Sequence, residues 1–176
     1  GKLGAAKLAT GLGVTLGLYA LFGTASAAVM ALTYGVEAGD APLQLLQIGF
    51  AYPLTLGQAA AWGLVCVLGG CLLMTALLLL ASAALRSAFP VVVGATVLLL
   101  VPMMFDLDPT SAPLWPLLAL NLLPSRMMKF ENIFCPAPYD FFGTVLSQYI
   151  VFPAAAILFS LPLAALAMRA YRRHQG

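Results

Sequence analysis

Long apolar runs separated by short polar segments dominate this chain of 176 residues. Four runs cover about 8–34, 56–85, 89–105 and 141–168, and none contains a charged residue between its ends. A helix needs about 20 apolar residues to cross the roughly 30 Å hydrocarbon core of a bilayer. The pattern therefore predicts one all-α, polytopic membrane domain over residues 1–176, with four transmembrane helices.

A fifth apolar segment, 112–124, is too short to cross a bilayer. It contains Pro113 and Pro116 and ends at Pro124. Apolar segments of about 10–14 residues are typically buried, interfacial or re-entrant. Irregular backbone at membrane depth persists only when it is buried in protein or lines water. We therefore expect a short re-entrant or interfacial segment packed inside the bundle.

Local signals predict where the helices begin. Thr55 and Gln58 have the spacing of a capping box, in which each side chain bonds the other residue's backbone N–H. They predict that the second span starts at about residue 56. The stretch 125–140 is expected to be a polar loop, and Asp140 is placed to cap the last helix.

Composition excludes a water-soluble domain. The chain is 62% hydrophobic and 8% charged, with a mean hydropathy of +1.01, whereas soluble domains carry about 25% charged residues. The chain is therefore expected to be embedded in a lipid bilayer. A net charge of +2 is too small to indicate a nucleic-acid partner.

Charge is segregated along the chain. Acidic residues occur only between the first and second runs or between the third and fourth, and most cations lie at the opposite ends of the runs. Positive charge marks the cytoplasmic side, which predicts that both termini are cytoplasmic and that 35–53 and 106–140 face outward. Arg126 and Lys129 are the exceptions. The acids are Glu37, Asp40, Asp106, Asp108, Glu131 and Asp140, and the segregated cations are Lys2, Lys7, Arg86, Arg169, Arg172 and Arg173.

Motifs for catalysis and cofactor binding are missing from the sequence. It has no phosphate-binding GxxxxGK[ST] and no HExxH, and its single histidine, His174, lies in the basic tail. Three cysteines give neither a disulfide framework nor a metal motif. We expect no catalytic residue, no metal and no cofactor. Gly13 and Gly17 form a small-xxx-small pair, which is a candidate site for close helix packing.

Several loop motifs together resemble bacterial ABC transporter permeases of the type-2 exporter class. They lie in the first outer loop, at the start of the second span, at the end of the short segment, after the last span and at the start of the chain. The stretches are Gly39-Asp40-Ala41-Pro42-Leu43-Gln44, Tyr52-Pro53-Leu54-Thr55-Leu56-Gly57-Gln58, Leu120-Asn121-Leu122-Leu123-Pro124, Ala170-Tyr171-Arg172-Arg173-His174-Gln175 and Gly1-Lys2-Leu3-Gly4-Ala5-Ala6-Lys7-Leu8.

The resemblance implies a multi-pass permease of the bacterial cytoplasmic membrane. Such permeases usually have six spans, so this chain is expected to be a C-terminal portion holding spans three to six. Two permease copies and two separate ATPase subunits normally form the exporter, and this chain would then not be an enzyme. The short segment would be the outer gate, with candidate residues Trp115, Asn121, Pro124 and Arg126.

Two other functions remain open at this point. One is a structural or assembly membrane protein without transport activity, which a neighbouring ATPase gene would argue against. The other is a small membrane enzyme acting on lipid at the outer face, with Asp106, Asp108 and Arg126 as its polar groups. Two aspartates of this kind can act as general acid and general base.

Overall fold

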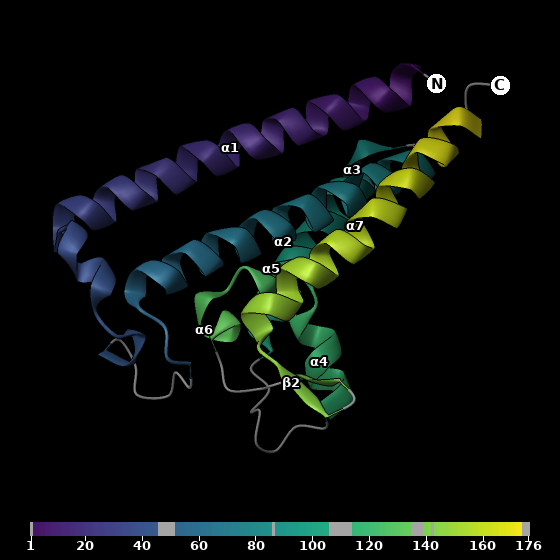
Figure 1. Ribbon diagram of the computed structural model, residues 1–176. Coiled ribbons are helices and arrows are strands. Elements are labelled where there is room, and N and C mark those ends of the chain that lie inside the picture. Colours follow the sequence, from purple (N-terminus) through teal and green to yellow (C-terminus); the bar gives the residue numbers. More distant parts are fainter. Residues whose placement is uncertain are drawn as a thin grey trace.

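The protein is an all-α, multi-pass membrane bundle. A computed structural model describes residues 2–45, 52–85, 87–105, 114–134, 139–141 and 143–173. Three helices are long and apolar enough to span a membrane, and a fourth, α3, is shorter. At 1.5 Å per residue α3 is about 25 Å long. The chain termini lie at the same end of the bundle (Figure 1). These four helices are α1 (Lys2–Tyr34), α2 (Leu56–Ala84), α3 (Ala88–Met104) and α7 (Gln148–Arg173).

Helix α2 is the central element. It contacts α1, α3, α7 and two of the short helices between α3 and α7. Its closest neighbour is α7: a Cβ added at Gly69 would lie 3.0 Å from the Cβ of Ala156. Cys66 on α2 and Phe152 on α7 are fully buried in this seam. Large apolar side chains on α1 and α3 are instead exposed, as expected for surfaces that face lipid.

The start of α2 confirms the predicted capping box. The Thr55 hydroxyl accepts a hydrogen bond from the Gln58 backbone N–H at 3.3 Å, and the Gln58 side chain accepts one from the Thr55 N–H at 3.1 Å. The preceding loop folds back on this corner, because the Leu43 N–H donates to the Leu54 carbonyl at 2.9 Å. Leu43 is fully buried as a result. The loop contains two 3-10 helices, η1 (Val36–Asp40) and η2 (Leu43–Leu45).

The last span begins later than the sequence pattern predicted. Helix α7 starts at Gln148 rather than at 141 and continues to Arg173. The residues before it form an antiparallel hairpin in which Asp140, the predicted helix cap, pairs with Val145. Gly143 takes φ +83° in the turn, a conformation that glycine adopts without steric cost. The hairpin strands are β1 (Tyr139–Phe141) and β2 (Thr144–Leu146).

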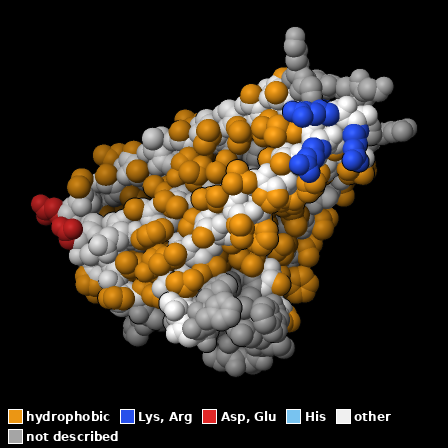
Figure 2. Space-filling view, turned by 45° about the vertical axis from the view of Figure 1, so that its right-hand side comes forward, with side chains coloured by type: hydrophobic (Ala, Val, Ile, Leu, Met, Phe, Trp, Pro, Cys, Tyr) orange, Lys and Arg blue, Asp and Glu red, His pale blue; other side chains and the backbone are white. Residues whose placement is uncertain are grey.

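Charges on the folded chain follow the predicted segregation. In Figure 2, Lys and Arg side chains gather at one end of the molecule, acidic side chains project at the other, and hydrophobic side chains cover the surface between them. We call the first the basic end, where the start of α1 holds Lys7 and the end of α7 holds Arg169 and Arg173, and the second the acidic end, where η1 holds Glu37 and Asp40. This is the charge pattern of a multi-pass membrane protein whose termini share one side.

Candidate functional site

Three short helices between α3 and α7 form a re-entrant unit, residues 114–134. It lies beside α2 and α7, away from the chain termini (Figure 1). The predicted segment 112–124 corresponds to its first helix and the start of its second, and residues 112 and 113 lie outside the described part of the chain. The helices are α4 (Leu114–Asn121), α5 (Pro124–Met127) and α6 (Phe130–Ile133).

The prediction of a polar loop over 125–140 is wrong where the chain forms α5 and α6. All four residues of α5 are buried, and so are Ile133 and Phe134 after it. The polar side chains that suggested a loop alternate with apolar ones that pack on α2 and α7. Helices of one turn carry too little periodicity to stand out in a sequence.

The re-entrant unit reaches the middle of the bundle. A Cβ added at Gly70 of α2 would lie 2.7 Å from the Cγ of Met128 and 3.1 Å from the Pro124 carbonyl oxygen. Gly70 is about 21 Å from the first residue of α2 at 1.5 Å per residue, close to half of the helix. Only a residue without a side chain allows α5 to approach this closely.

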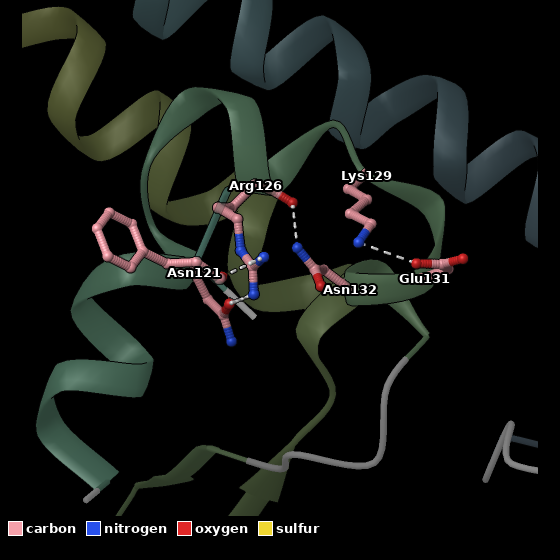
Figure 3. A network of polar contacts seen from close by, with 6 residues as sticks. Asn121, Arg126, Lys129, Glu131 and Asn132 are labelled. Carbon is pink, nitrogen blue, oxygen red and sulfur yellow. Dashed lines mark hydrogen bonds and ion pairs between the residues drawn. The ribbon is translucent and has the colours of Figure 1, made fainter. Parts of the chain in front are cut away.

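Arg126 is the charged centre of the unit. Its side chain is 3% exposed. One guanidinium nitrogen donates to the Phe105 carbonyl at 3.1 Å, and the other donates to the Asn121 side-chain oxygen at 3.5 Å. The Asn132 amide in turn donates to the Arg126 carbonyl at 3.2 Å (Figure 3). Arg126 therefore joins the end of α3 to all three short helices. Buried intramembrane cations are costly and commonly mark functional positions.

Lys129, the other exception to the charge pattern, lies differently. Its ammonium is 3.0 Å from a carboxylate oxygen of Glu131, and their side chains are 32% and 67% exposed. Figure 3 shows this pair pointing away from Arg126. An exposed ion pair contributes about 0–1 kcal/mol. The Lys129–Glu131 pair therefore lies on the surface of the unit, whereas Arg126 is buried and hydrogen-bonded in its interior.

Aromatic side chains hold the unit to the ends of α2 and α7. The Tyr149 ring lies 5.1 Å from Trp62 and 6.2 Å from Phe134, measured between centroids, and Phe134 lies 4.8 Å from Phe130. The Tyr52 ring meets Tyr149 edge-on at 5.2 Å. Such pairs contribute about 0.5–1.5 kcal/mol each beyond their burial. They form a seam between α6 and the helices on either side.

The structure unites three of the four predicted gate residues. Asn121 and Arg126 are hydrogen-bonded, and Pro124 begins the buried α5 between them. The backbone of Trp115 belongs to α4, and its side chain lies outside the described part of the structure. Asp106 and Asp108, named for the alternative lipid enzyme, also lie outside the described residues.

The predicted packing glycines, Gly13 and Gly17, face no other element of the described chain. A Cβ at either position would meet no atom within 4 Å. Helix α1 approaches α2 at other glycines: a Cβ at Gly11 would lie 3.5 Å from Thr75, and one at Gly23 would lie 3.7 Å from Leu64. The small-xxx-small face of α1 is thus open in the described structure.

Sequence inspection missed other residues that shape the site. Gly69 and Gly70 have no side chains, so α7 packs closely against α2 at Gly69 and α5 packs closely against it at Gly70. Ser125 is fully buried, and its hydroxyl donates to the Leu98 carbonyl at 3.4 Å. Two consecutive glycines inside an apolar run were the available signal. Within the described ranges, no three His, Cys, Asp or Glu side chains come together as metal ligands would.

Comparisons with known proteins identify no relative. No protein-family model, curated protein or solved structure matches this chain. Its function is therefore inferred from the re-entrant unit and from the sequence motifs.

Proposed function

We propose that this chain is the membrane-spanning permease subunit of an ATP-driven ABC exporter. It would form the substrate path, and ATP would be hydrolysed by a separate subunit. The observation that carries the proposal is the re-entrant unit, which inserts a buried, hydrogen-bonded arginine into the middle of an otherwise uncharged helix bundle. The resemblance of the loop motifs to type-2 exporter permeases supports the same proposal.

The re-entrant unit would be the outer gate of this permease. Positive charge at the basic end favours a cytoplasmic location for both termini in a bacterial cell membrane, so the acidic end would face outward. Asn121, Pro124 and Arg126 would hold the gate closed through the contacts to α2 and α3 described above. The open face of α1 with Gly13 and Gly17 leaves room for a second permease copy.

Recovery of the partner ATPase tests the assignment. The whole protein is purified from its native membrane in mild detergent, and its co-purifying proteins are identified by mass spectrometry. We expect a nucleotide-binding ATPase subunit in the complex. A preparation that is folded and holds no such subunit would count against the exporter and favour a structural role.

Locking the re-entrant unit tests the gate. The Cys71 thiol lies 3.9 Å from the Met128 sulfur, so Met128→Cys brings a second thiol near Cys71, across α2 and the unit. Oxidation should lower the ATPase activity of the purified complex, and a reductant should restore it. The control, Met128→Cys with Cys71→Ser, cannot form the bridge. If a bridged complex hydrolyses ATP at the unbridged rate, the unit is not a gate.

A further inference from the structure

A groove between α2 and α3 opens at the basic end of the bundle. Its inner part has a volume of about 400 Å³ and is lined by apolar side chains, among them Leu78 and Leu79 of α2 and Ala95 and Leu99 of α3. The Thr96 hydroxyl in this lining donates to the Val92 carbonyl of its own helix at 3.0 Å, so it offers the groove little polarity. The groove therefore suits a hydrocarbon chain.

The mouth of the groove is polar and cationic. A second cavity of about 290 Å³ adjoins the first, and Ser82, Val91 and Val92 line both. Lys7 and Ser87 line only this outer cavity. A lysine ammonium carries three donors and no acceptor, and a serine hydroxyl can donate one more bond. This combination fits an anionic oxygen-rich group such as a phosphate diester.

Tyr171 positions the cation at the mouth. The Lys7 ammonium lies 4.7 Å from the centre of the Tyr171 ring, within the range of a cation–π contact. The ring is itself fixed, because its hydroxyl donates to the Leu79 carbonyl at 3.2 Å and is hydrogen-bonded to the Ser82 hydroxyl. Tyr171 is 6% exposed. Lys7 therefore lies against a ring of α7 that is itself hydrogen-bonded to α2.

The depth of the groove matches one leaflet of a bilayer. From Ala88 at the mouth to Leu99, α3 rises about 16 Å, and half of the hydrocarbon core is about 15 Å. The polar mouth would thus lie at the headgroup level of the leaflet at the basic end, with the apolar part beneath it. We propose that this groove binds one acyl chain of an anionic phospholipid, whose phosphate is held by Lys7 and Ser87.

Retention of lipid by the purified full chain tests the proposal. The protein is extracted from nanodiscs containing equal amounts of phosphatidylglycerol and phosphatidylcholine, and bound lipids are counted by native mass spectrometry. Lys7→Ala should lower retention of phosphatidylglycerol about fivefold, the effect of one cation near an anionic surface, and Lys7→Arg should largely keep it. Arg172→Ala removes an exposed charge from the same end without touching the groove. Equal losses in Lys7→Ala and Arg172→Ala would overturn the site.

A matched pair on α3 tests the acyl-chain part. Val91 lines both cavities, whereas Val97 lines neither and is 51% exposed. Val91→Phe fills the groove and should reduce retention, and Val97→Phe should leave it unchanged. Retention unaffected by Val91→Phe would refute an acyl chain in the groove.

A photoreactive probe separates lipid from protein as the occupant. Phosphatidylglycerol carrying a photoreactive acyl chain should label α3 between Val91 and Leu99, and Val91→Phe should abolish that label. A photoreactive side chain placed at Val92 should cross-link to lipid in native membranes. Cross-linking of that side chain to another protein chain would overturn the proposal by showing that the groove is a protein interface.

Discussion

Replacing Gly70 by alanine should destabilise the bundle, although alanine is the better helix former. The new Cβ would lie 2.7 Å from the Met128 Cγ and 3.1 Å from the Pro124 carbonyl oxygen, whereas carbon atoms pack best at about 3.5–4.0 Å. The Met128 side chain must move by roughly 1 Å and the Pro124 backbone must give by a few tenths of an ångström, and overpacking of this kind costs about 1–3 kcal/mol. Helix propensity returns about 1 kcal/mol. We expect a net loss of about 1 kcal/mol in the free energy of unfolding.

Gly94→Ala in α3 is the matched control, because nothing lies within 4 Å of a Cβ there. It should gain up to about 1 kcal/mol from propensity alone, so the two variants should differ by about 2 kcal/mol. Unfolding is followed by circular dichroism while a denaturing detergent is added to mixed micelles. In a Met128→Ala background the cost of Gly70→Ala should shrink, which a double-mutant cycle measures. If Gly70→Ala is as stable as Gly94→Ala, the close approach of α5 to α2 is refuted.

Two further predictions concern polar contacts. Thr15→Ala should lower the free energy of unfolding by about 0.6 kcal/mol, because the Thr15 hydroxyl is hydrogen-bonded to the Thr75 hydroxyl between α1 and α2 at 2.7 Å. The control is Thr24→Ala, because the Thr24 hydroxyl bonds carbonyls of its own helix. Equal losses for the two variants in the same detergent titration would contradict the interhelical bond. Glu131→Gln should change the free energy of unfolding by less than about 0.5 kcal/mol, because the ion pair of Glu131 with Lys129 is exposed. A loss of several kcal/mol in thermal unfolding would contradict this and show that the pair stabilises the fold.

The spans and their polarity could be predicted from the sequence because lipid imposes strong constraints. Long uncharged runs give the helices, and the capping box at Thr55 and Gln58 gives the start of α2 to the residue. The start of α7 could not be read in the same way. Most residues of the hairpin at 139–146 are apolar, like those of the span after it, and only Gly143 hints at its turn.

The interior of the candidate gate was harder to predict. Arg126 and Lys129 are three residues apart and equally basic in the sequence, yet Arg126 is buried and Lys129 is on the surface. Their difference arises from tertiary contacts to Phe105 and Asn121, which local patterns do not encode. Likewise, the sequence pointed to glycines on α1, whereas the tightest contact occurs at Gly70, because which face of a helix meets a neighbour depends on the whole fold.

The seam between α2 and α7 joins parts of the chain that leave the ribosome at different times. Ala156, which packs on Gly69, follows it by 87 residues. At about 5–20 residues per second, synthesis of that stretch takes about 4–17 s. During this interval α2 is in the membrane with its glycine face open and its principal partner not yet made. Helix α1 meets α2 on a different face, at Leu64 and Thr75, so lipid or the insertion machinery would cover the Gly69 face until α7 arrives.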